Sequence, residues 1–174
     1  MKNRTLRQLT AAGVIAAAYA ALSLVLATIT FGPVQCRISE ALTLLPVISP
    51  AAIWGVTLGC AVTNGVGAAT GANFLGLVDL PVGTAATLLA AVATRLLGKI
   101  RFGGLPWLSA LPPILINAVA IGGEWCYAMT GSINGAYWVF AGQIALGQLP
   151  PCLLGVWLVG LLERRSLQTI IEGK

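Results

Sequence analysis

The scarcity of charged side chains is the feature that most limits what this chain can fold into. Only 9% of its 174 residues are Asp, Glu, Lys or Arg, and its mean hydropathy is +0.90. Soluble domains carry about 25% charged residues, so this composition cannot cover a globule with a water-soluble surface. We therefore expect an all-α integral membrane protein, built as a single transmembrane domain over residues 1–174. That length suffices for about six spans of roughly 20 residues each.

Apolar runs bounded by proline, glycine or charge indicate the helices. The first run follows a basic start, is about 20 residues long and lacks a clear cleavage site, so we interpret it as a span rather than a signal peptide. The second run is short, and we expect it to be tilted or partly covered by protein. We expect Pro150 and Pro151 to bend the last helix. The predicted ranges are 9–29, 37–49, 51–69, 81–97, 107 or 113 to 128, and 136–162.

Positive charge predicts the orientation of these six helices. Lys and Arg gather at the start of the chain, between the fourth and fifth helices, and after the sixth. Cytoplasmic loops carry an excess of Lys and Arg, so six helices place both termini in the cytoplasm of a multi-pass protein of the cell membrane. The opposite loops contain no Lys or Arg except Arg37. The three groups are Lys2, Arg4 and Arg7; Arg95, Lys99 and Arg101; and Arg164, Arg165 and Lys174.

Polar side chains gather in the outer third of the predicted bundle. At about 1.5 Å of rise per residue, several lie one or two turns below the outer helix ends or in the adjoining loops. The inner half holds mainly Asn117 and Gln148, near the middle. Ionisable residues inside a membrane usually mark function, so we predict a pocket open to the outside rather than a continuous channel. The outer residues are Gln35, Arg37, Glu40, Asn64, Asn73, Asp79, Glu124 and Gln143.

Four charged residues set the chemistry of this pocket. Arg37 and Glu40 are three positions apart and can pair on one helix; such a pair either contacts ligand or only fixes the first outer loop. Asp79 either binds ligand or caps the following helix. Glu124 has no partner near it in the sequence. If Arg37 and Glu40 pair, Asp79 and Glu124 remain as acceptors for a protonated amine or a ring with several N–H donors.

Amide and aromatic side chains complete the expected site for a flat, nitrogen-rich ligand. The amides can match both donors and acceptors, or hold helices together. Trp125, Tyr137 and Trp138 can stack on a planar ring, or form an interfacial belt. The candidate substrate-binding residues are Glu124, Asp79, Glu40, Arg37, Gln35, Asn117, Asn64, Gln143 and Trp138.

Other classes of function find little support in the sequence. There is no histidine, which excludes His-based catalysis and His metal sites, and no Gly-x-x-x-x-Gly-Lys-Ser/Thr loop for ATP. We therefore expect that the protein is not an enzyme and that it binds no cofactor, metal ion or nucleic acid. The four dispersed cysteines are interpreted as packing residues, with a Cys36–Cys126 disulfide left open.

Small residues at four-residue spacing mark one face of the first helix. Ala12, Ala16 and Ala20 form one row, and Gly13, Ala17 and Ala21 form its neighbour. Such a face lets another helix approach closely. It serves either internal packing or docking of another membrane protein.

Three segments resemble signature motifs of the QueT family. They are Phe31 to Pro46 (FGPVQCRISEALTLLP), Asp79 to Leu88 (DLPVGTAATL) and Leu111 to Ala118 (LPPILINA). Gln35, Arg37 and Glu40 match the first motif, Asp79 the second and Asn117 the third. The chain departs from the family pattern at Val82, where a bulky aromatic is expected, and at Gly147-Gln148, where an acid is expected after the glycine.

The resemblance implies a fold and a function. QueT proteins are identified as substrate-binding S components of energy-coupling factor (ECF) transporters for queuosine precursors such as 7-aminomethyl-7-deazaguanine (preQ1). It implies a six-helix S-component fold with ligand near the outer face. It also implies docking, partly through Ala12, Ala16 and Ala20, onto a membrane coupling subunit (the T component) that carries two cytoplasmic ATPases.

We therefore expect a high-affinity membrane subunit that binds a 7-deazapurine for ATP-driven import. One alternative is an S component for another nitrogen-rich vitamin, such as a thiamine- or pyridoxine-like ring. The other is a stand-alone secondary transporter, which the thin polarity of the inner half disfavours.

Overall fold

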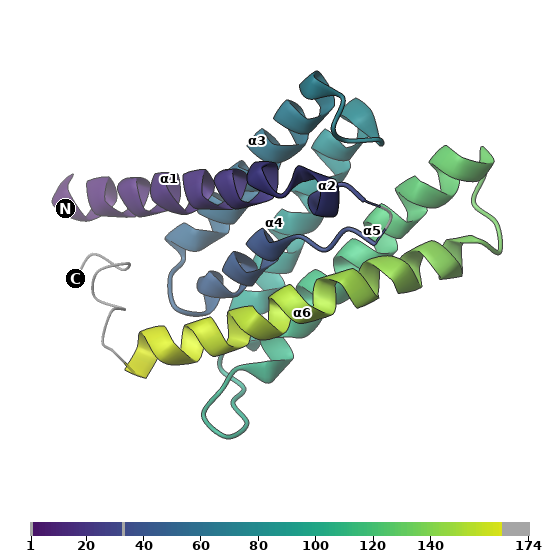
Figure 1. The fold of residues 1–174 in the computed structure, drawn as a ribbon. Helices are drawn as coiled ribbons and strands as arrows, with labels where there is room; N and C mark the ends of the chain where they lie inside the picture. The colour runs from purple at the N-terminus through teal and green to yellow at the C-terminus, as the bar shows by residue number, and fades with distance from the viewer. Residues whose placement is uncertain (1, 33, 165–174) are drawn as a thin grey trace.

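The computed structural model describes residues 2–32 and 34–164, and their regular structure is helical apart from one isolated bridge between Phe102 and Leu105. Five of the described helices are long and apolar enough to cross a membrane, which supports the prediction of an all-helical integral membrane protein. Arg165 and Lys174, used above for orientation, lie outside the described residues. The elements are α1 (Lys2–Val25), α2 (Ala27–Thr30), η1 (Ile38–Val47), α3 (Ala51–Thr70), η2 (Gly76–Val78), α4 (Asp79–Leu97), η3 (Trp107–Ala110), α5 (Leu111–Thr130) and α6 (Tyr137–Arg164) (Figure 1).

The predicted second helix is a ten-residue 3₁₀ helix, η1, rather than an α-helix. At about 2.0 Å of rise per residue it is about 20 Å long, which is less than the hydrocarbon core of about 30 Å. Its side chains are largely buried: Leu44 is fully enclosed and Glu40 is 1% exposed. The expectation of a short segment covered by protein is therefore confirmed.

The direction of α3 explains why η1 is needed. Gly55 of α3 faces Ile15 of α1, and Gly67 faces Phe31 at the end of α2, so α1 and α3 run in the same direction. The chain must therefore return between them, and η1 makes that return. The second predicted element is thus enclosed by protein, and the count of six membrane-spanning helices stays a prediction.

The first row of small residues on α1 is used for packing inside the protein. Ala12 is 6% exposed and Ala20 is 7% exposed. A Cβ atom built on Gly59 would lie 3.0 Å from the carbonyl oxygen of Ala16 and 2.6 Å from Cβ of Tyr19. Close approach through small residues is how membrane helices associate. The internal-packing interpretation thus fits Ala12, Ala16 and Ala20 better than a docking surface does, and it leaves the row Gly13, Ala17 and Ala21 exposed.

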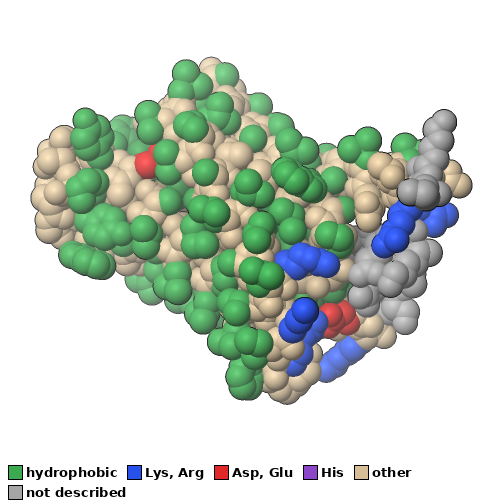
Figure 2. Space-filling view, turned by 180° about the vertical axis from the view of Figure 1, so that it is seen from behind, with side chains coloured by type: hydrophobic (Ala, Val, Ile, Leu, Met, Phe, Trp, Pro, Cys, Tyr) green, Lys and Arg blue, Asp and Glu red, His purple; other side chains and the backbone are tan. Residues whose placement is uncertain are grey.

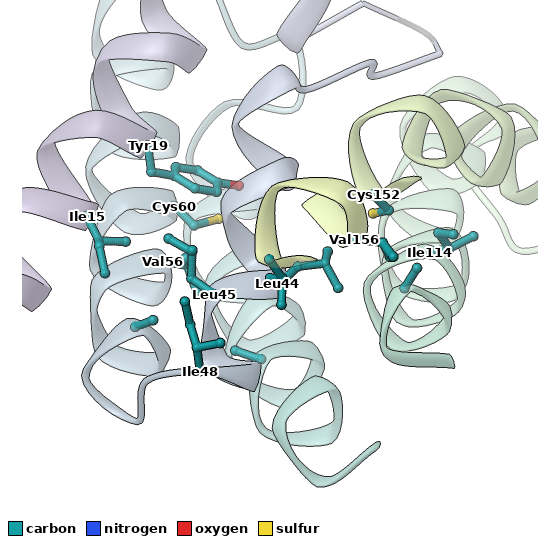
Figure 3. Packing of buried hydrophobic residues seen from close by; sticks show 14 residues of the cluster. Ile15, Tyr19, Leu44, Leu45, Ile48, Val56, Cys60, Ile114, Cys152 and Val156 are labelled. Carbon is teal, nitrogen blue, oxygen red and sulfur yellow. The ribbon is translucent and has the colours of Figure 1, made fainter. Parts of the chain in front are cut away.

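The apolar core surrounds η1. Leu44, Leu45 and Ile48 project among side chains of α1, α3, α5 and α6 (Figure 3). The neighbouring core residues include Ile15, Tyr19, Val56, Cys60, Ile114, Cys152 and Val156. The interior around the C-terminal part of η1 is thus closed by apolar packing, while the polar groups lie near its N-terminal end.

Basic side chains gather at one end of the molecule (Figure 2). Arg101, in the loop after α4, forms an ion pair with Glu163 at the end of α6, with 2.8 Å between Nη1 and Oε2. The start of α1 and the start of α3 line one cavity that includes Gln8 and Pro50. The ion pair brings the loop after α4 to the end of α6, and both segments carry basic residues that the charge pattern places on one side. Which side of a membrane this end faces stays a prediction.

Replacing Gly59 with alanine tests the α1–α3 contact. The added Cβ would meet Tyr19 and the Ala16 carbonyl, so we expect Gly59→Ala to cost about 1–3 kcal/mol of stability through overpacking. Thermal unfolding of the detergent-solubilised protein measures the effect. Gly142→Ala on α6 is the control, since a Cβ there meets nothing within 4 Å. Equal melting temperatures for the two variants would contradict the close α1–α3 approach.

Candidate substrate-binding site

An ion pair between Arg37 and Asp79 forms the centre of the polar region. Nη2 of Arg37 lies 3.2 Å from Oδ2 of Asp79, and the side chains are 4% and 0% exposed. Asn73 donates a hydrogen bond to the same carboxylate oxygen over 2.7 Å, and Asn64 donates to the backbone carbonyl of Asp79 over 2.9 Å. The cluster therefore connects the start of η1, α3, the loop before η2 and the start of α4.

The predicted pairing of Arg37 with Glu40 is wrong in this structure. Arg37 precedes η1 in an extended conformation (φ −89°, ψ 105°), so the two residues do not share a helical face. The Arg37 guanidinium instead lies 5.4 Å from the centre of the Phe31 ring as well as beside Asp79. Glu40 accepts a hydrogen bond of 2.6 Å from the Tyr19 hydroxyl.

Asp79 is consequently not the free acceptor that the sequence indicated. It is the first residue of α4 rather than the residue before it, and its carboxylate is engaged by Arg37 and Asn73. Its second oxygen, Oδ1, is buried without a hydrogen-bond partner. Asp79 thus combines a structural role with one open acceptor position.

Glu124 keeps both carboxylate oxygens unpartnered. The two oxygens are buried and accept no hydrogen bond from the described protein. The side chain lines a cavity of about 310 Å³ between the end of α5 and the segment before α4, where Leu75, Val78 and Tyr127 also lie. It is within electrostatic range of Asp79 and Arg37. Burying a carboxylate without a partner is costly, so this position favours a ligand that brings positive charge.

More unpartnered polar atoms occur on residues that the sequence singled out. Native proteins leave few buried polar atoms without a hydrogen bond, and each one calls for an explanation such as a ligand or water. In this group acceptors outnumber donors, which fits a ligand rich in N–H groups. The acceptors are Oε2 of Glu40, Oδ1 of Asn64, Oδ1 of Asp79, Oε1 of Gln143 and both oxygens of Glu124; the donors are Nε2 of Gln35 and Nε1 of Trp125.

Backbone strain places Gln35 in this group. Its φ of 46° makes it the single non-glycine residue with positive φ in the described part of the chain, and its side chain is 2% exposed. Such conformations are uncommon outside glycine and persist where surrounding structure enforces them, often at functional sites. The strain is therefore a second reason to include Gln35.

Asn117 shares a face of α5 with Glu124. The two positions are seven residues apart, which corresponds to nearly two full turns of an α-helix, and Asn117 is 4% exposed. Gln148 of α6 is also enclosed, with Cys152 near its side-chain oxygen. All four cysteines are free, so Cys36 and Cys126 form no disulfide here.

Aromatic side chains are arranged differently from the expectation. Trp138 is 76% exposed and packs edge-on against Tyr137, which suits an interfacial belt rather than a ligand contact. Trp125 is 4% exposed and stacks between Phe74 and Phe140, at 5.4 Å and 6.4 Å between ring centroids. The sequence offered no signal for these two phenylalanines, because isolated Phe residues are unremarkable in so apolar a chain.

Comparison with known proteins gives one match. A family model described as QueT transporter matches residues 9–164, which is most of the chain. No curated protein and no solved structure match.

Removing one partner of the central ion pair should destabilise the protein strongly. Arg37→Leu leaves the buried Asp79 carboxylate uncompensated, and such a change costs about 3–5 kcal/mol. Arg101→Leu, which breaks the partly exposed pair with Glu163, is the matched control and should cost about 0–1 kcal/mol. Thermal unfolding in detergent compares the two.

A double variant separates charge imbalance from lost packing. Arg37→Leu combined with Asp79→Leu should recover part of the stability lost in Arg37→Leu alone, because no unpaired charge remains. If the double variant is less stable than the sum of the two single changes predicts, the ion pair is not the source of the effect.

Proposed function

The chain belongs to the QueT transporter family, and we propose that it is the substrate-binding subunit through which a queuosine precursor crosses the cell membrane. The preferred ligand class is a 7-deazapurine such as preQ1. In this proposal the protein binds and carries its solute without changing it chemically.

The unpartnered carboxylate of Glu124 is the observation that carries the proposal. PreQ1 has a protonated aminomethyl group, and a charged hydrogen bond to this carboxylate would satisfy oxygens that the described residues leave without a hydrogen-bond partner. The apolar lining of the adjoining cavity suits the flat ring system.

The remaining open positions support the same ligand class. The guanine-like edge of preQ1 presents N1–H and 2-amino donors, and the unpartnered acceptors of Asp79, Asn64 and Gln143 are of the kind that receives them. The donors of Gln35 and Trp125 suit a ring carbonyl or ring nitrogen. A neutral ligand with few N–H groups would leave most of these acceptors unsatisfied.

Energy for import comes from separate subunits in this proposal. The sequence lacks a Gly-x-x-x-x-Gly-Lys-Ser/Thr loop, which fits a membrane coupling subunit and two cytoplasmic ATPases. Since Ala12 and Ala20 are buried against α3, we assign docking instead to the exposed side of α1 and α3. Val14 (63% exposed), Trp54 (62%) and Leu58 (53%) lie there.

Glu124→Gln is the sharpest test of the proposed ligand. Losing one charge-assisted hydrogen bond corresponds to about a 10- to 100-fold weaker affinity for cationic preQ1. The neutral nitrile preQ0 should lose less. Equilibrium binding to the purified protein measures both ligands, with Glu163→Gln as the control because Glu163 pairs with Arg101 at the basic end.

Three results would redirect the proposal. Absence of thermal stabilisation by saturating preQ1, preQ0 and queuine would contradict the deazapurine assignment. Stabilisation by thiamine or a pyridoxine-like ring instead would indicate an S component for another vitamin. Solute flux into liposomes that hold only this chain would indicate a stand-alone transporter.

A further inference from the structure

An apolar groove follows the seam between α4 and α5 on the outside of the bundle. It has a volume of about 630 Å³ and no charged residue in its lining. Leu89 (61% exposed), Leu115 (57%) and Val119 (61%) form its open rim. The lining residues are Pro81, Val82, Ala85, Ala86, Leu89, Leu115, Ile116, Val119 and Ala120.

The groove leads towards the cavity that contains Glu124. On α5 the lining passes from Val119 and Ala120 to Gly123 and Glu124, one helical turn further on. On the other side of the seam it passes from Pro81 of α4 back to Val78 of η2, which lines the cavity. The two hollows therefore follow one another along the same seam, with a carboxylate at one end. On the face drawn in Figure 2, one acidic side chain stands among hydrophobic ones, far from the basic end.

The dimensions fit one lipid leaflet. Leu115 lies about 13 Å from Glu124 along the α5 axis, and half of the hydrocarbon core is about 15 Å. Glu124 lies about 9 Å before the end of α5 at Thr130. The ammonium group of a lipid therefore has to reach less than two helical turns inwards from the end of α5 to meet this carboxylate.

We propose that a lipid with a primary-amine headgroup occupies the α4–α5 groove, with one acyl chain along the groove and its ammonium group on the Glu124 carboxylate. The apolar lining selects a hydrocarbon chain, and the buried anionic oxygens select a cation that can donate hydrogen bonds. A trimethylated headgroup has no N–H to donate, and an anionic headgroup would meet Glu124 with like charge.

This site would also regulate ligand binding. When no solute is present, the lipid ammonium neutralises Glu124; the solute amine then displaces it. This competition rests on the proposed function, whereas the lipid site does not. The expected consequence is an apparent solute affinity that falls as the amine-lipid content of the membrane rises.

Native mass spectrometry of the purified full chain tests the lipid site. The protein is equilibrated with equal amounts of phosphatidylethanolamine, phosphatidylcholine and phosphatidylglycerol that carry identical acyl chains. We expect about tenfold enrichment of phosphatidylethanolamine over phosphatidylcholine, the size of one charge-assisted hydrogen bond. Glu124→Gln should abolish this preference.

Groove variants test the acyl-chain contact without altering Glu124. Ala85→Phe and Ala120→Phe place bulk in the groove and should lower retention of phosphatidylethanolamine at least about fivefold by excluding the chain. Ala18→Phe is the control, because Ala18 is exposed on α1, outside the groove. Size-exclusion profiles and melting temperatures select the variants that are folded.

Two results would overturn the lipid site: equal retention of the amine and trimethylated lipids by the unaltered protein, or a preference that survives both Glu124→Gln and the groove variants. PreQ1 binding by the unaltered protein and by the folded Ala120→Phe variant separates the two proposals. If the unaltered protein binds preQ1 but shows no preference for the amine lipid, the lipid site fails alone. If the Glu124-dependent lipid preference is present while preQ1 does not bind, the deazapurine assignment fails alone.

Discussion

The buried ion pair between Arg37 and Asp79 is the interaction on which the polar region depends, where the start of η1, α3 and the start of α4 meet. Removing two charges from water is costly unless they also receive hydrogen bonds; here Asn73 donates to the Asp79 carboxylate and Asn64 donates to the Asp79 backbone carbonyl, while Oδ1 of Asp79 stays open. The pair joins positions 42 residues apart in the sequence. Because it engages Arg37 and one carboxylate oxygen of Asp79, Glu40 is bonded to Tyr19 instead, and Glu124 keeps no hydrogen-bond partner among the described residues.

Small residues make the enclosure of the polar cluster possible. Gly55 and Gly59 bring α3 against α1, and Gly155 receives the carbonyl of Ala41 so that α6 lies directly on η1. In a membrane there is little hydrophobic gain from pressing helices together, so close backbone packing supplies much of the association energy. The protein thereby surrounds a short segment that lipid alone would not accept.

Hydropathy predicted the long helices well, because a span needs a continuous apolar run and loops carry the charges. It could not predict that η1 is a 3₁₀ helix, which depends on what surrounds it. The residues of the polar region were found from their depth, but their partners were not: Arg37 reaches Asp79 instead of Glu40 because its backbone is extended before η1. Trp125, not Trp138, is the enclosed aromatic, since helix rotation cannot be read from composition. The roles of these residues towards a ligand are still predictions.

The shortness of η1 has a consequence for how the chain is assembled in the membrane during synthesis. A segment of this length, with Ser39, Glu40 and Thr43 among its residues, has little tendency to insert by itself. Its native surroundings include α6, which follows the other described helices in the chain and is translated after them. The 136 residues before α6 are therefore synthesised while η1 is still incompletely covered. Shortening α6 would harm the threading of the N-terminal half more than its distance along the chain suggests.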